Sequence, residues 1–346
     1  MLSFVATAAA ALALSPFLGA SAMNVSNVLV YSATAGFRHD SIPTAVDSLS
    51  KLGSSYGINF VNTEDPTRFN DEYLSQFDAL FFLHTTEEVL DSRGKAAFQR
   101  YLDNGGNFVG VHAAANCLLN FTTMERTLDD HLFADIRRVS VLADPVASLI
   151  TGSQFAYHPD FTNATIVVLD ANHPSTAPLP PQWRVRDEIY NFNHDPRDLG
   201  AVVVLTVDER SYHDDGDRSP GQGSPHPIAW YMEKLRGTNS TGLVGRSWYT
   251  ALGHSNASWV DDMFMSHIMG GVSWVVASNT TRALNPSATV GSLGPEYTPP
   301  AQPPQTTATI DSHGGASSVF NHGIFGGLSA VGAASLFSAL WVLHTF

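Results

Sequence analysis

The sequence predicts an α/β domain with a doubly wound, mainly parallel β-sheet. In the first half of the chain, short apolar runs alternate with helical patterns, and these runs are near-continuous rather than alternately apolar and polar. A parallel sheet that is covered by helices on both faces requires such strands. The strand–helix alternation implies right-handed crossovers between neighbouring strands. Strands are expected at residues 27–33, 57–62, 78–84 and 107–112.

Two helices are expected between these strands. Ser41 can cap the first helix, Pro43 lies in its first turn, and Leu49 belongs to its apolar face. The second helix is expected to begin at Asp91 and to run through Leu102, where a Gly-Gly pair ends it. Both helices therefore fit the crossovers of a doubly wound sheet.

The second half of the chain is less regular, and its strands are expected to extend the sheet in antiparallel fashion. A long loop is expected over 210–227 and a closing helix over 258–277. The strands are expected at residues 166–170, 188–192, 201–207 and 243–252.

The two ends of the chain resemble targeting segments. Residues 1–22 are apolar and end in a small-x-small cleavage site, which is typical of a signal peptide. Residues 284–318 form a Pro/Ser/Thr-rich linker, and 319–346 supply the spacer and apolar tail of a GPI signal, with attachment near Gly315. The folded domain would then span 23–283. We expect a secreted protein that is held at the plasma membrane or cell wall by a lipid anchor only.

Composition excludes two classes of protein. The 18 Lys and Arg residues against 32 Asp and Glu residues give a net charge of −14, so no nucleic-acid partner is expected. With 44% apolar residues the chain is too hydrophobic to be disordered. The single cysteine, Cys117, is expected to be a small buried hydrophobe. N-glycosylation is expected at six sequons, at Asn24, Asn120, Asn163, Asn239, Asn256 and Asn279.

Polar residues, histidines above all, follow the predicted strands. Ligands of open α/β sheets bind at the carboxyl ends of the strands. Imidazoles serve there as proton carriers or metal ligands near neutral pH, although a single histidine is more often structural. The candidate residues are Arg38, His39, His84, Glu88, His112, Asn116, His194, His226, Arg246 and His254.

Several segments together resemble the trehalose-utilisation (ThuA-like) family. They are VLVYSATAGFRHDSI, FDALFFLHTTEEVL, FQRYLDNGGNFVGVHAAAN, HPIAWY and GRSWYTALGHSNASW, spread over roughly residues 25–280. The resemblance implies the flavodoxin-like core of the class I glutamine amidotransferase-like superfamily. It also implies a link to carbohydrate metabolism.

Two possible nucleophiles are rejected on the sequence. True amidotransferases carry a cysteine in the sharp turn after the fourth strand, but here His112 stands in that turn and Cys117 lies five residues further on. Thiolate attack on glutamine is therefore not expected. Residues 253–257 resemble a hydrolase nucleophile elbow, yet the pattern is relaxed at Ala257 and a sequon begins at Asn256, so Ser255 is not expected to react.

The leading hypothesis is an enzyme that acts on a sugar or sugar derivative by acid–base chemistry. His39 and His112 would transfer protons, with Glu88 as the partner carboxylate. Tyr190 and Trp248 are further candidates for stacking on a sugar. The expected substrate-binding residues are Arg38, Asn116, His226, Trp230, Arg246 and His254.

Two alternatives remain open at this stage. A glycosidase would need two carboxylates, for which Glu87, Glu88 and Glu188 are candidates. A non-catalytic protein that binds glycans or cell-wall polymer would suit the anchor and stalk equally well. No cofactor is certain because compact zinc motifs are absent from the sequence, but a divalent metal held by His39, His112 and His254 with Glu88 is possible.

Overall fold

The computed structural model describes residues 25–119, 151–218, 220–235, 238 and 244–290 apart from 283, 286 and 289. All of them belong to the first of two units of the chain, Met1–Tyr297. The predicted signal peptide, the GPI signal with Gly315, and the sequons at Asn24, Asn120 and Asn239 lie outside the described residues. Within the described part, no helix is both long and apolar enough to cross a membrane.

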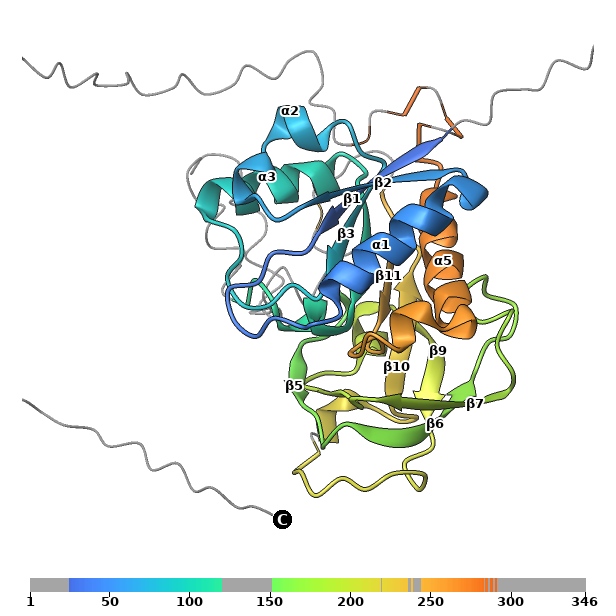
Figure 1. Cartoon of the computed structure of the whole chain (residues 1–346). Coiled ribbons are helices and arrows are strands. Elements are labelled where there is room, and N and C mark those ends of the chain that lie inside the picture. Colours follow the sequence, from blue (N-terminus) through green and yellow to red (C-terminus); the bar gives the residue numbers. More distant parts are fainter. Residues whose placement is uncertain are drawn as a thin grey trace, which may run out of the picture. The chain divides into compact units, whose positions relative to one another are not determined.

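One sheet of nine strands organises the domain, in the order β2-β1-β3-β4-β11-β10-β9-β6-β7 (Figure 1). The first five strands in this order run parallel, and the remaining pairings are antiparallel. The parallel strands are β1 (Ser26–Tyr31), β2 (Ile58–Thr63), β3 (Ala79–Leu83), β4 (Asn107–Val111) and β11 (Ser247–Thr250). The antiparallel strands are β10 (Pro227–Met232), β9 (Val202–Val207), β6 (Thr162–Val168) and β7 (Gln182–Asp187). The predicted α/β class is confirmed, and β10, β9, β6 and β7 form the expected antiparallel extension. The strand expected at 243–252 is a correction, because β11 pairs parallel with β4 inside the sheet.

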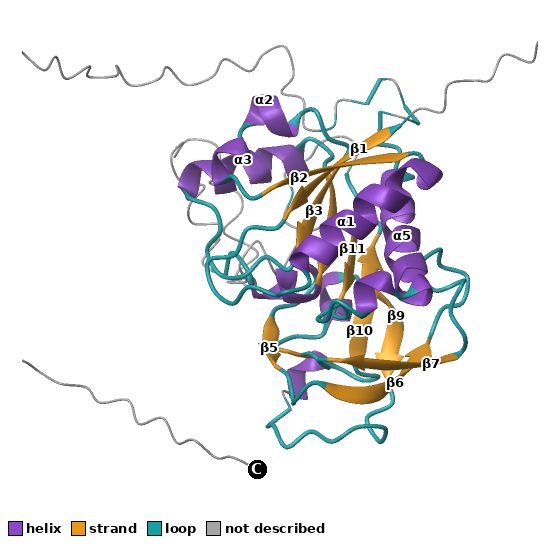
Figure 2. Cartoon of the chain, in the orientation of Figure 1, coloured by secondary structure: helices purple, strands orange, loops and turns teal. Residues whose placement is uncertain are grey.

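Helices cover both faces of the parallel part, as a doubly wound sheet requires (Figure 2). Helices α1 (Ile42–Gly53) and α5 (Asp262–Val276) lie on one face, and α2 (Asp71–Leu74) and α3 (Ser92–Asp103) lie on the other (Figure 1). Asp91 caps α3 as predicted, because its side chain accepts a hydrogen bond from the Gly94 amide at 2.8 Å. Ser41 precedes α1 but does not cap it, since its hydroxyl donates to the His254 carbonyl at 2.7 Å.

The second half corrects two expectations. The predicted strand at 188–192 is wrong over most of its length, because only β8 (Asn191–Phe192) is extended there, paired with β5 (Phe155–Tyr157) in a separate small sheet. The true edge strand, β7, comes directly before it. Its sequence, QWRVRD, alternates charged with apolar side chains, so it lacks the apolar run by which the other strands were recognised.

Strand register brings the carboxyl ends of the parallel strands to one level. Val111 at the end of β4 pairs with Leu83 of β3 on one side and with Thr250 of β11 on the other. The residues that follow these three strands therefore become neighbours at one edge of the sheet. The parallel strands have the flavodoxin-like order 2-1-3-4-5, for which ligands are expected at this edge.

Candidate metal centre

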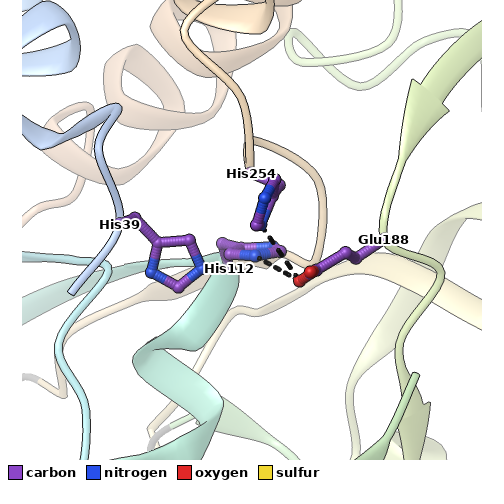
Figure 3. A group of neighbouring side chains, drawn as sticks. All are labelled: His39, His112, Glu188 and His254. Atoms are coloured by element: carbon purple, nitrogen blue, oxygen red, sulfur yellow. Dashed lines mark ion pairs between the residues drawn. The ribbon is translucent and has the colours of Figure 1, made fainter. Parts of the chain in front are cut away.

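Four side chains from distant parts of the chain converge at this edge of the sheet (Figure 3). His39, His112 and His254 follow β1, β4 and β11, and Glu188 follows β7. One nitrogen or oxygen atom of each lies within 4.8 Å of the corresponding atoms of the other three. We call these four residues the histidine cluster. The expectation that the three histidines meet is thus supported by their geometry.

The carboxylate of the cluster is Glu188, which corrects the prediction of Glu88. The Glu88 carboxylate instead lies 2.7 Å from the Nζ atom of Lys95, a buried residue of α3. Glu88 cannot partner His112 while it neutralises that ammonium group. Glu188 reaches the cluster from the antiparallel half of the sheet, a long-range contact that strand-end reasoning within the parallel half does not reveal.

His112 sits in a strained turn directly after β4. Its φ angle is 56°, in the left-handed region that residues other than glycine rarely adopt. Tyr249 holds the turn by donating a hydrogen bond to the His112 carbonyl at 2.8 Å. Such strain persists only when the surroundings fix it, and it concentrates at functional sites. His112 therefore occupies the sharp turn that the sequence indicated for it.

Hydrogen bonding fixes the tautomer of a neutral His112 ring. Its Nδ1 atom lies 2.6 Å from the Ala251 carbonyl oxygen, which only accepts, so Nδ1 carries the proton. Nε2 then presents its lone pair 3.2 Å from Oε2 of Glu188 and 2.9 Å from the Tyr190 hydroxyl, which can donate to it. A lone pair and a carboxylate oxygen repel each other at this distance. The Tyr190 hydroxyl can satisfy this lone pair, and a proton or a cation between Nε2 and Oε2 would turn their repulsion into an attraction.

Glu188 is held as a charged carboxylate. Burial alone would raise its pKa, but hydrogen bonds with His112 and His254 outweigh that effect and lower the pKa below its ordinary value. The Nδ1 atom of His254 lies 3.1 Å from Oε2 of Glu188, and this contact raises the pKa of His254. Asp187 fixes the loop that carries His254. Its carboxylate accepts hydrogen bonds from the backbone amides of Gly253 and His254 at 2.8 and 3.1 Å.

His39 offers a neutral imidazole to the cluster. Burial, followed by the neighbouring His112 and His254, lowers its pKa to about 3. Its Nδ1 atom is buried and has no hydrogen-bond partner within the described residues. The ring stacks on His84 with 4.6 Å between centroids, which restrains its orientation. A buried nitrogen without a partner is costly, so His39 is suited to a ligand that supplies one.

His158 is a functional candidate that the sequence did not single out. Its Nε2 atom lies 3.5 Å from Oε2 of Glu188, and its ring stacks on Tyr190 with centroids 5.6 Å apart. Nδ1 lies 2.8 Å from the Pro159 carbonyl, which leaves the Nε2 lone pair facing Glu188. With its side chain 33% exposed, His158 connects the buried cluster to solvent. It follows the short strand β5, which gave no signal in the sequence.

Three of the predicted substrate-binding residues lie away from the cluster. Arg246 precedes β11 and so lies at the opposite edge of the sheet, where it pairs with Glu233 at 3.0 Å. His226 is buried, and its Nε2 atom lies 2.8 Å from the Tyr190 carbonyl. Trp230 is buried with its indole nitrogen bonded to a backbone carbonyl. None of the three belongs to the histidine cluster, so the structure does not bring them to the predicted site.

The remaining aromatic and polar candidates have mixed outcomes. Trp248 and Tyr190 are buried, so neither can form an open shelf for a sugar. Asn116 ends the short helix after His112, where its carbonyl accepts the Glu87 amide at 2.7 Å, and it makes no hydrogen bond to the cluster among the described residues. Cys117 is buried, which raises the pKa of its thiol to about 12 and makes it unsuited to nucleophilic attack.

A hollow of about 440 Å³ opens beside His39 and His254. Arg38, a predicted substrate-binding residue, lines this hollow and so lies near the cluster. Its guanidinium group pairs with Glu64 at 2.7 Å. The Ser255 hydroxyl, which also lines this hollow, contacts that of Ser258 rather than an imidazole. The sequons at Asn163, Asn256 and Asn279 are exposed, and Asn256 also lies on the rim; their glycosylation stays a prediction.

Comparisons with known proteins agree with the architecture. The family model for ThuA, described as trehalose utilisation, matches residues 27–275. A ThuA-like protein from Bacteroides uniformis superposes with a TM-score of 0.55 at 19% identity, covering 78% of this chain and 99% of that one. A ThuA-like protein from Parabacteroides merdae gives a TM-score of 0.49 at 17% identity, covering 72% of this chain and 90% of that one. No curated protein matches. The chain belongs to the ThuA (trehalose utilisation) family.

Proposed function

We propose that this protein is a metal-dependent enzyme that acts on a sugar or sugar derivative. The ligands of one divalent ion are His39, His112, Glu188 and His254. The observation that carries the proposal is the convergence of three imidazoles and one carboxylate, with Nε2 of His112 3.2 Å from Oε2 of Glu188. A cation between the two atoms removes their repulsion, and the His39 imidazole, kept neutral by its lowered pKa, lies within reach as a further ligand.

The donor set fits zinc. Imidazole and carboxylate are ordinary zinc ligands, with bonds of about 2.0–2.2 Å, so ligand atoms of a tetrahedral site lie roughly 3.3 Å apart. Glu188 Oε2 lies 3.2 Å from His112 Nε2 and 3.1 Å from His254 Nδ1. A zinc ion bound there would act as a Lewis acid toward a substrate oxygen in the adjoining hollow, because zinc can expand to five ligands.

Two further residues supply proton transfer. Burial raises the pKa of Tyr190 well above its ordinary value, so its hydroxyl keeps its proton. With Nε2 of His112 bound to the metal, this hydroxyl is released from that nitrogen and can donate to a substrate oxygen instead. His158 lies between Glu188 and solvent, and it carries protons to and from the cluster. In this proposal Tyr190 and His158 take part in proton transfer, and Glu88 does not.

The sugar substrate and the location are inferred from other observations. The family description, trehalose utilisation, supports a carbohydrate substrate. Buried side chains converge in a closed cluster, while Trp230 and Trp248 are buried rather than displayed, which favours an enzyme over a glycan-binding surface protein. We place the enzyme outside the cell, lipid-anchored at the surface and glycosylated, on the strength of residues 1–22, 319–346 and the sequons.

The test combines metal content with turnover. The secreted protein is stripped with a chelator, reloaded with zinc, and incubated with trehalose, other disaccharides and aryl glycosides, whose consumption is followed by proton NMR. We expect about one zinc per chain, zinc-dependent consumption of at least one sugar, and loss of both in His112→Ala. His213→Ala is the control, because His213 is exposed on the 208–226 loop. Zinc retained by His112→Ala, or no sugar consumed by the zinc-loaded protein, would contradict the proposal.

A further inference from the structure

A second hollow adjoins the histidine cluster and has a different chemistry. Its volume is about 310 Å³, and most of its wall is apolar, formed by Phe161, Trp183, Val185, Leu252 and Phe264. Two arginines, Arg184 and Arg186, and two carboxylates, Asp187 and Asp261, also line it. Both carboxylates already accept backbone amides, Asp187 those of the 253–254 turn and Asp261 that of the first turn of α5. An apolar hollow with a few placed polar groups is the usual form of a small-molecule site.

Phe161 joins this hollow to the cluster. Its ring centroid lies 5.2 Å from that of His254, and the Arg186 guanidinium stacks on the same ring at 4.9 Å. Phe161 and Ser255 line both hollows. A ligand whose reacting end lies at His254 can therefore extend past Phe161 toward Arg186 without leaving the protein surface.

The two arginines are unusual in an acidic protein of net charge −14. Arg184 and Arg186 are both exposed and have no ion pair with any residue that the structure describes; the one polar contact is between Arg184 and the Thr165 hydroxyl at 3.4 Å. Among the described arginines, Arg93 is the only other one without an ion pair. The others pair with carboxylates: Arg38, Arg68, Arg100, Arg197, Arg210, Arg218, Arg246 and Arg282.

Strand geometry places these charges at the hollow. Arg184 and Arg186 are two residues apart on β7, so they project on the same side of the strand, opposite to Trp183 and Val185. All four residues line the hollow, which therefore lies along this edge strand of the sheet. Two guanidinium groups side by side repel each other unless an anion accepts hydrogen bonds from them. Guanidinium binds carboxylate in bidentate fashion, and a neighbouring apolar wall strengthens that bond by excluding water.

We propose that this second hollow binds an apolar group that carries a carboxylate. Building on the proposed function, the substrate is then a sugar derivative whose sugar lies at the histidine cluster and whose acidic apolar substituent lies between Phe161 and Phe264. Arg184 and Arg186 select the charge, and the apolar wall selects the body of the substituent. A neutral, unsubstituted sugar leaves this hollow empty.

The test uses 2-naphthoate and its neutral isostere 2-naphthamide, titrated by calorimetry into the full-length secreted protein in the presence of a chelator. The chelator removes zinc, so naphthoate cannot bind as a metal ligand. We expect naphthoate to bind at least tenfold more tightly than naphthamide. The double variant R184Q/R186Q should lose this preference while R93Q, which removes the other arginine without an ion pair, should keep it.

Three results would overturn the inference. They are equal affinities for the two probes, a preference for naphthoate that survives in R184Q/R186Q, and no binding of naphthoate at millimolar concentration. Zinc content, measured on the same variants, separates this inference from the proposed function. If zinc binds and naphthoate does not, only the acidic substituent is refuted; if naphthoate binds and zinc does not, only the metal-dependent enzyme is refuted.

Discussion

Replacing Glu188 by glutamine separates a metal ligand from an ordinary ion-pair partner. The glutamine amide keeps the size of the side chain but removes its charge. Oε2 of Glu188 makes the contacts with both His112 and His254, so a single amide atom replaces it. In the metal-free protein the amide oxygen can accept from Nδ1 of His254, while Nε2 of His112 keeps the Tyr190 hydroxyl as its donor. We therefore expect the free energy of unfolding of the metal-free variant to change by less than about 1 kcal/mol.

Zinc binding should respond much more strongly. At a free zinc concentration a thousand times its Kd, the wild-type protein gains about 4 kcal/mol of stability. Loss of the carboxylate ligand is expected to weaken zinc about 100-fold, which leaves about 1.4 kcal/mol at the same concentration. The difference, roughly 2.7 kcal/mol, corresponds to a loss of about 5 °C in the zinc-induced rise of Tm for a domain of this size.

The assay is thermal unfolding at pH 8 with and without buffered zinc. Glu88→Gln is the matched control, because Glu88 pairs with Lys95 outside the cluster. Its own stability should fall, but its zinc-induced rise of Tm should equal that of the wild-type protein. The reasoning is refuted if Glu188→Gln keeps the full rise. It is also refuted if the metal-free variant loses about 3–5 kcal/mol, as expected when a buried ion pair loses one partner.

Three further predictions concern the surroundings of the cluster. Tyr249→Phe leaves the buried His112 carbonyl without its donor, so urea unfolding should show a loss of about 1–3 kcal/mol. His158→Ala should keep its zinc but lose about 10²-fold in kcat, measured with zinc content on the same sample. Burial lowers the pKa of His267 to about 4, so between about pH 6.5 and 4 only the unfolded state binds this proton, and stability falls as pH falls across that window. His267→Gln should reduce the slope of the free energy of unfolding against pH there by up to about 1.4 kcal/mol per pH unit.

The parallel half of the fold was predictable because its strands are buried on both faces. Continuous apolar runs mark β1, β3 and β4, and the residues after them include His39 and His112. The carboxyl ends of parallel strands meet at one edge, so the sequence brings these histidines together without any knowledge of long-range contacts. His254 follows β11, which was expected in the antiparallel part of the sheet; its parallel pairing with β4 is what brings His254 to the same edge.

The carboxylate could not be found in this way. Glu188 follows an antiparallel edge strand, β7, whose arginines are exposed, and its place depends on how β7 joins the far end of the sheet. Arg246 was misplaced because the expected strand at 243–252 extends too far toward the N-terminus; the observed strand begins at Ser247, so Arg246 precedes it. Sequence pattern likewise cannot distinguish a buried Trp230 from one that faces a cleft.

The central claim is that the histidine cluster binds a metal ion. A crystal of the zinc-loaded protein, measured on both sides of the zinc absorption edge, tests it most directly. The account predicts one anomalous peak about 2.0–2.2 Å from Nε2 of His112, Nδ1 of His254, a carboxylate oxygen of Glu188 and a nitrogen of His39. It would be contradicted by a crystal in which zinc binds only elsewhere while Nε2 of His112 remains hydrogen-bonded to Tyr190.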